Sequence, residues 1–120
     1  MADITEELDK IGAETADALE RFMDDREMYL KYVTSFPDEG TMQKLVAAVE
    51  AKDYIQAEKS VHALKGIVIN LGFLPLADVA MDMLEELRDG SIDEALKSYE
   101  NVKKQYKIFC DTIRACCENS

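Results

Sequence analysis

The sequence predicts an all-α protein, an antiparallel four-helix bundle with one or two additional N-terminal helices. Hydrophobic residues make up 48% of the chain, with only five glycines and two prolines, a composition that favours helices over sheets. Apolar residues recur at spacings of three and four along most of the chain. Short connectors separate these stretches, which makes successive helices antiparallel. The 120 residues fit one domain, 1–120, with a single core that needs no disulfides.

The N-terminal third is expected to hold two helices. Ile4, Leu8 and Ile11 predict a short first helix with Thr5 as its cap. A second helix is expected over about 14–35, with a break near 24–25 as the alternative. The stripe assigned to this second segment comprises Leu19, Phe22, Met23, Arg26, Tyr29, Leu30 and Val33. Pro37 lacks a backbone donor and restricts the residue before it, so 36–40 is a connector.

Turn and capping residues divide the rest of the chain into four helices. Thr41 is a candidate cap for a helix with apolar positions over 42–49, and Asp53 is the expected N-cap of the next helix. Gly72 can take the positive φ that ends that helix. Pro75 suits the first turn of a following helix, which reaches about 87. A turn at 89–91 then precedes a last helix over about 92–115.

The helix over 53–72, DYIQAEKSVHALKGIVINLG, contains the single histidine of the chain. Its core stripe on a helical wheel comprises Ala57, Val61, Leu64, Val68 and Leu71. His62 lies about 140° from the centre of this stripe and therefore points to solvent. Gly66 costs about 1 kcal/mol relative to alanine in a helix, yet its missing side chain lets another backbone approach His62. Lys65 places a cation where a phosphate on the ring could reach it.

The ordinary alternative is that a lone histidine on a helix is a surface residue or a hydrogen-bonded core residue. The helical wheel places His62 away from the core stripe, which argues against a core residue. Gly66, which costs helix stability, argues against an ordinary surface residue. Neutral imidazole is a good nucleophile, and its usual pKa near 6.5 keeps much of it neutral at pH 7. The segment therefore favours a reactive histidine that a partner can approach closely.

The run HALKG over 62–66, followed by NLG over 70–72, resembles the signature of histidine-containing phosphotransfer (HPt) domains of bacterial phosphorelays. The resemblance covers roughly 23–90. Val61 departs from it, since the family favours alanine there, and Phe73 follows the glycine. The resemblance implies that His62 accepts a phosphoryl group from a receiver-domain aspartate, through the ring nitrogen farther from the backbone, and passes it to another. It further implies that Lys65 neutralises the phosphate and Gly66 admits the partner.

The partners that the resemblance implies are response-regulator receiver domains and a hybrid sensor kinase. Any Mg²⁺ is implied to sit in the receiver, so no cofactor is expected in this chain. Ile55, Lys59 and Ile69 share the exposed face with His62 and form a candidate docking patch. The alternative for the isoleucines is packing against the N-terminal helices. A polar residue of the next helix is expected to orient the ring, with Asp78, Asp82 and Glu85 as candidates.

The charge of the chain narrows the possible partners. Net charge is −11 at pH 7, which argues against nucleic acid and anionic membranes. Residues 1–40, 41–75 and 76–120 carry −8, +1 and −4, so the histidine segment is the least negative, although such unevenness is also ordinary variation. No apolar run approaches the roughly 20 residues of a membrane span. The acidic N-terminus resembles no signal or transit peptide, and a cytoplasmic monomer is expected.

Two other functional classes compete with phosphotransfer. One is a non-catalytic interaction or adaptor bundle that binds receiver domains without phosphotransfer. The other is a hydrolase built on cysteine and histidine or on paired carboxylates, which the scattered acids disfavour. No GxxxxGK[ST] motif is present, so no kinase or ATPase site is seen. Cys110, Cys116 and Cys117 lack metal-ligand spacing and are expected to be reduced thiols, part core and part surface.

Overall fold

The computed structural model describes residues 3–118, and within that range the chain is helical with no strand. In chain order the elements are α1 (Ile4–Lys10), α2 (Thr15–Arg21), α3 (Arg26–Ser35), the 3₁₀ turn η1 (Phe36–Asp38), α4 (Thr41–Glu50), α5 (Tyr54–Leu71), α6 (Leu74–Arg88) and α7 (Ile92–Glu118). The predicted all-α class is confirmed. Over the same residues, no helix is both long and apolar enough to cross a bilayer.

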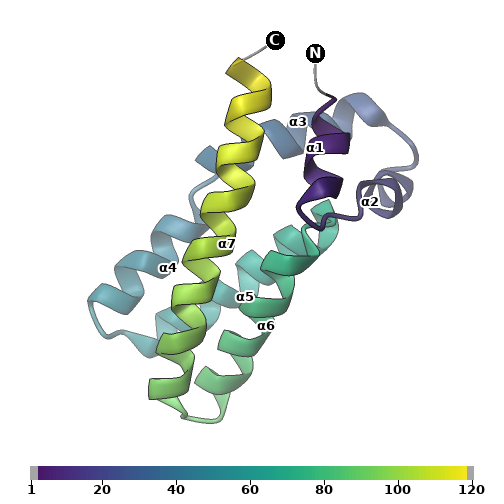
Figure 1. Cartoon of the computed structure of the whole chain (residues 1–120). Coiled ribbons are helices and arrows are strands. Elements are labelled where there is room, and N and C mark those ends of the chain that lie inside the picture. Colours follow the sequence, from purple (N-terminus) through teal and green to yellow (C-terminus); the bar gives the residue numbers. More distant parts are fainter. Residues whose placement is uncertain (1–2, 119–120) are drawn as a thin grey trace.

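The four C-terminal helices pack in sequence order. Helix α5 packs against both α4 and α6, and α7 packs against α6. Short connectors join them, so that neighbours run in opposite directions (Figure 1). Helices α1, α2 and α3 gather at the end of the molecule where α5 finishes and α6 begins, with α1 beside α7 and α2 beside α5. The N-terminal helices therefore cover one end of the long helices.

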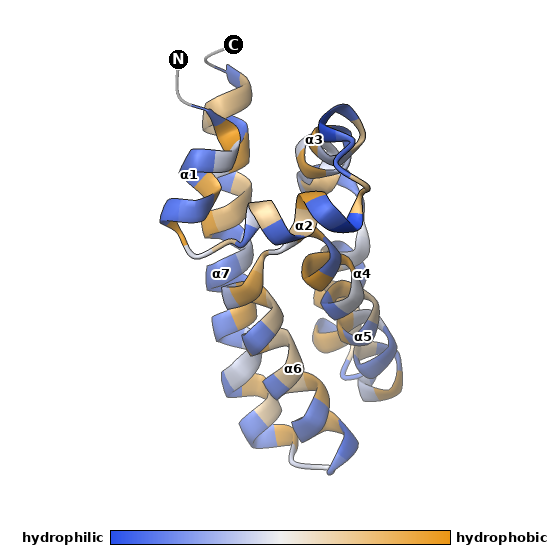
Figure 2. Cartoon of the chain, turned by 90° about the vertical axis from the view of Figure 1, so that its right-hand side faces the viewer, coloured by the Kyte–Doolittle hydropathy of each residue, from blue (hydrophilic) through white to orange (hydrophobic). Residues whose placement is uncertain are grey.

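The core follows from amphipathic helices and an aromatic cluster. Hydrophobic and hydrophilic positions alternate around each helix (Figure 2), and the apolar faces turn inward. Phe73 stacks on Phe109 with ring centroids 4.5 Å apart and meets Phe36 edge-on at 5.4 Å. These rings come from η1, the link before α6, and α7. The cluster therefore ties η1 to the start of α6 and to α7, in the geometry that aromatic rings prefer.

The helix expected over 14–35 is two helices, and the uninterrupted version of that prediction is wrong. Met23 and Asp24 have φ of 56° and 60°, in the left-handed region that a continuing right-handed helix excludes. Asp25 then caps α3, its carboxylate accepting a hydrogen bond from the Met28 backbone N–H at 3.0 Å. Met23, placed on the apolar stripe by its spacing, is 89% exposed at this turn.

Two predicted helix caps are one or two residues out of place. The cap of α1 is Asp3, whose carboxylate accepts hydrogen bonds from the backbone N–H and hydroxyl of Thr5. Helix α4 begins after Gly40, and the Glu39 carboxylate accepts from the backbone N–H and hydroxyl of Thr41. In both cases a carboxylate accepts two bonds at once, which makes it a stronger cap than a single hydroxyl.

The signals that bound the histidine helix are confirmed. The Asp53 carboxylate caps α5 by accepting from the Gln56 N–H at 3.1 Å, Gly72 ends the helix at φ 81°, and Pro75 lies in the first turn of α6. The last helix runs to Glu118, beyond the expected end near 115, because no helix-breaking residue intervenes. The sequence also predicts fraying of residues 118–120; Glu118 is helical, and residues 119 and 120 lie outside the described range.

The cysteines of α7 divide between core and surface, as expected. Cys110 is buried, Cys116 is half-buried and Cys117 is exposed. Burial raises the pKa of the Cys110 and Cys116 thiols above the usual value. A raised pKa lowers the thiolate fraction at neutral pH and with it the reactivity of these two groups.

Candidate functional site

His62 lies on the solvent-facing side of α5, as the helical wheel predicts. The five residues of the expected core stripe are all buried, namely Ala57, Val61, Leu64, Val68 and Leu71. His62 and Gly66, on the opposite face, are exposed. The buried stripe fixes the rotation of the helix about its axis, because turning it would expose these side chains. Packing of the core therefore determines where the imidazole points.

Gly66 stands beside open space. A Cβ atom built at Gly66 meets no heavy atom within 4 Å other than its own helix backbone and neighbours. Gly72 is the opposite case, since a Cβ there lies 2.7 Å from the Glu14 carbonyl oxygen. Nothing inside the described molecule therefore requires position 66 to be glycine. The missing side chain leaves the helix backbone accessible one turn after the imidazole.

Two lysines flank His62 on the same helix. Lys65 is half-buried and Lys59 is exposed. Within residues 3–118, neither ammonium makes an ion pair or a hydrogen bond with another side chain. Each lysine sits about one turn from the histidine, Lys59 before it and Lys65 after it. Both ammonium groups are therefore available to an anion held at the ring.

The proposed docking residues form one line along α5. Ile55, Lys59, His62, Gly66 and Ile69 follow one another at spacings of four, three, four and three, which places them on one helix face. The line is about 20 Å long at 1.5 Å per residue. Ile55 is 76% exposed, so the N-terminal helices do not cover it, whereas Ile69 is 38% exposed at the end nearest those helices.

The side chain that reaches His62 from another helix is Arg88, in the last turn of α6. Its Nη2 lies 3.4 Å from the ring Nδ1. Its Nε lies 3.9 Å from a carboxylate oxygen of Glu58, one turn before His62 on α5. The histidine therefore shares its surroundings with two lysines, one arginine and one carboxylate, a locally positive group in an acidic chain.

The candidates for orienting the ring were Asp78, Asp82 and Glu85, and none of them hydrogen-bonds to His62 among the described residues. Arg88 continues the same spacing on α6, three residues after Glu85. The three candidates ended one turn before Arg88, which lies on the same face of α6. The long arginine side chain spans the distance that the shorter acids do not.

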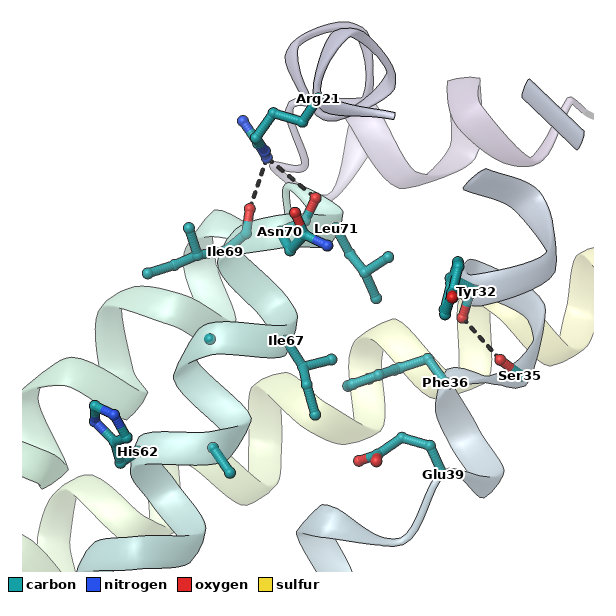
Figure 3. Close-up of a pocket in the computed structure, with 12 residues that line it drawn as sticks. Arg21, Tyr32, Ser35, Phe36, Glu39, His62, Ile67, Ile69, Asn70 and Leu71 are labelled. Carbon is teal, nitrogen blue, oxygen red and sulfur yellow. Dashed lines mark hydrogen bonds between the residues drawn. The ribbon is translucent and has the colours of Figure 1, made fainter. Parts of the chain in front are cut away.

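A groove of about 810 Å³ runs beside the histidine. In Figure 3 His62 lies at one end and Arg21 at the other, and Ile67 and Phe36 point toward one another across the groove. The lining residues are Arg21, Tyr32, Ser35, Phe36, Glu39, His62, Ala63, Gly66, Ile67, Ile69, Asn70 and Leu71. One wall is α5 and the other is α3 with η1. The sequence does not predict the second wall, because its residues lie far from His62 in the chain.

The N-terminal helices satisfy the carbonyl groups at the end of α5. The Arg21 guanidinium donates to the carbonyls of Ile69 and Asn70 at 2.6 and 3.2 Å. The Tyr29 hydroxyl donates to the Leu71 carbonyl at 2.8 Å, and the Glu14 N–H donates to the Gly72 carbonyl at 2.8 Å. The last carbonyls of a helix have no partner within it. Helices α2 and α3 supply those partners and hold the end of the histidine helix.

Searches against family models, curated proteins and solved structures returned no match to this chain. The chemistry of the site must therefore be inferred from its own geometry. An exposed imidazole is a nucleophile and an acceptor for a transferable group. The nearby cations could stabilise an anion held at the ring, and the open space at position 66 leaves the imidazole accessible to another molecule.

Proposed function

We propose that this chain is a histidine phosphotransfer protein of a phosphorelay. His62 accepts a phosphoryl group from the aspartate of one receiver domain and passes it to the aspartate of another. The observation that carries the proposal is the arrangement on α5, where an exposed imidazole has open space at Gly66 and, among residues 3–118, the Lys65 ammonium has no ion pair. The resemblance of HALKG and NLG to HPt domains points to the same chemistry.

Each residue of this face has a distinct role in the proposal. His62 is the phosphoacceptor. Lys65 pairs with the phosphate, and Gly66 allows the active-site loop of the receiver to approach the ring. Ile55, Lys59 and Ile69 contact the receiver surface around the ring. Mg²⁺ belongs to the receiver, so this chain supplies no metal ligand.

The proposal includes an architecture and a cellular setting. Helices α4, α5, α6 and α7 constitute the four-helix bundle. The additional N-terminal helices are α1, α2 and α3, more than the one or two expected, because the segment over 14–35 is broken at Met23 and Asp24. The chain acts as a cytoplasmic monomer that exchanges phosphoryl groups with response-regulator receiver domains and a hybrid sensor kinase. Its net charge of −11 disfavours nucleic acid as a competing partner.

The second candidate is an adaptor bundle that binds receiver domains without phosphotransfer. The groove beside His62, lined largely by apolar residues, favours it, because a groove supports binding whether or not chemistry follows. The two candidates differ in one respect, since only the first forms a covalent phosphohistidine.

Incubation with ³²P-labelled receiver domains separates the two candidates. The phosphotransfer proposal expects label on this chain that is stable in alkali and lost in acid, as phosphoramidate bonds are. Receiver binding by titration calorimetry without transfer of label would support the adaptor instead. A chain that neither binds nor becomes labelled by any receiver of a broad panel would contradict both candidates.

A further inference from the structure

The contact between Arg88 and His62 carries information about the proton on the ring. Among residues 3–118, Arg88 is the side chain that hydrogen-bonds to the imidazole, with Nη2 at 3.4 Å from Nδ1. The guanidinium is anchored on its other side by Glu58, whose carboxylate oxygen lies 3.9 Å from Nε. Arg88 approaches from α6 and Glu58 from α5, so the guanidinium bridges the two helices at the histidine.

The direction of this hydrogen bond is fixed by chemistry. A guanidinium has five N–H donors, no acceptor, and stays protonated at all ordinary pH values. Nδ1 must therefore accept with a lone pair. A neutral imidazole with a lone pair on Nδ1 carries its proton on Nε2, and an imidazolium has no lone pair to offer. The contact selects one of the two neutral tautomers.

We infer that Arg88 is a positioning residue that holds resting His62 in the tautomer with the proton on Nε2. The effect of this tautomer on phosphotransfer rests on the proposed function, whereas the assignment of the tautomer does not. Nε2 is the nitrogen farther from the backbone, the one that the HPt resemblance assigns as phosphoacceptor. With a proton in place, Nε2 has no lone pair for attack. Arg88 therefore lowers the reactivity of the unengaged histidine.

Acceptance of a phosphoryl group then requires Arg88 to leave Nδ1. The Glu58 carboxylate, already 3.9 Å from Nε, is a partner to which the guanidinium can shift. The ring proton moves from Nε2 to Nδ1 through solvent. The Nε2 lone pair then forms the N–P bond, the P–O bond to the receiver aspartate breaks, and its electron pair remains on the carboxylate. The transferred proton stays on Nδ1.

The first test measures the tautomer without any phosphoryl donor. The chain has one histidine, so a ¹⁵N-histidine-labelled sample gives a single pair of ring nitrogen signals. At about pH 8.5, where a histidine ring is ordinarily neutral, we expect the Nε2–H form to dominate. Arg88→Ala should lower the ratio of Nε2–H to Nδ1–H on the order of threefold, the effect of an exposed charged contact.

Two further variants make this test independent of folding and of general charge. Arg88→Met keeps the length of the apolar stem and removes every donor, so it should shift the tautomer as alanine does. Arg114→Ala removes an exposed arginine of α7 that does not contact the ring and should leave the ring signals unchanged. Equal tautomer ratios in the wild type, Arg88→Ala and Arg88→Met would overturn the inference while leaving the proposed function intact.

The second test uses phosphoramidate as a small phosphoryl donor. Arg88→Met should become labelled faster than the wild type, on the order of threefold, in proportion to its gain of the Nδ1–H tautomer. Slower labelling of Arg88→Met would overturn the inhibitory role of Arg88. It would indicate instead that the guanidinium binds the incoming phosphoryl group. If no variant is labelled by phosphoramidate or by phosphorylated receivers while the tautomer shifts as expected, the proposed function fails and the assignment of Arg88 stands.

Discussion

At the scale of single residues, the face of α5 combines three small features that are unremarkable alone. His62 is exposed, Lys65 is half-buried without an ion pair in the described range, and Gly66 borders open space. The helical period alone predicts the exposure of His62, because the core stripe leaves one face for solvent. The contact with Arg88 is not predictable in this way, since it depends on how far an arginine side chain reaches between two helices.

Gly66 provides the first prediction. Gly66→Gln should raise the free energy of unfolding by up to about 1 kcal/mol, the gain in helix propensity, because no neighbouring atom obstructs a side chain. The same side chain should slow phosphotransfer from a receiver roughly 10²-fold, since displacing reactants by about 1 Å can cost this much. Urea denaturation and single-turnover transfer measure the two effects.

Gly72→Ala is the matched control for this variant. Its Cβ would lie 2.7 Å from the Glu14 carbonyl oxygen at a residue with φ of 81°, so it should lower stability. Unchanged transfer by Gly66→Gln would show that the partner does not approach at this position.

The two lysines provide the second prediction. Lys65→Ala should lower the amount of phosphohistidine at equilibrium with a receiver up to about fivefold, the worth of an exposed ion pair, with thermal stability nearly unchanged. Lys59→Ala should change that equilibrium less and weaken receiver association in a salt-dependent way. Transfer equilibria and receiver binding are measured for both variants at two salt concentrations. Identical behaviour of the two variants would show that Lys65 contributes only general positive charge and does not pair with the phosphate.

At the scale of elements, the histidine helix is the part best predicted from sequence. Asp53 and Gly72 mark its ends and its buried stripe follows the helical period, because each of these signals is local. The break between α2 and α3 is harder to predict. It rests on left-handed backbone at Met23 and Asp24, residues that do not require this conformation, so local sequence does not specify it.

The end of α5 provides the third prediction, which concerns pH. Burial raises the pKa of Tyr29 to about 12, whereas an unfolded tyrosine titrates near 10. The folded state therefore keeps a proton that the unfolded state loses, so stability is complete below about pH 10 and falls as pH rises toward 12. Burial also raises the pKa of Tyr106 to about 12, so Tyr29 and Tyr106 both contribute to the loss of folding stability at alkaline pH.

Tyr29→Phe separates their contributions. At pH 7 it should lower the free energy of unfolding by about 1–3 kcal/mol, because the buried Leu71 carbonyl loses its donor at 2.8 Å. Between pH 9 and 11 it should lose less stability than the wild type, with Tyr106→Phe as the comparison. Urea midpoints across this range measure both effects, and a pH slope equal to that of the wild type would contradict the role given to Tyr29.

At the scale of the whole molecule, the N-terminal helices complete the site. They donate hydrogen bonds to the last carbonyls of α5, and α3 with η1 forms the second wall of the groove beside His62. The helical period and the turn residues predict the all-α class, but they do not predict which distant segments share a groove. That depends on the packing of α2 and α3 across the end of α5, through contacts between residues more than 40 positions apart.

The most direct test of the central claim is phosphorylation of His62 itself. The wild type and His62→Gln are incubated with the same phosphorylated receiver, and acid-labile phosphate is mapped by mass spectrometry. Because His62 is exposed and off the core stripe, the variant should fold with an unchanged melting temperature and circular dichroism spectrum. We predict label on His62 of the wild type and none on the variant. A folded His62→Gln that still takes up acid-labile phosphate would contradict the account.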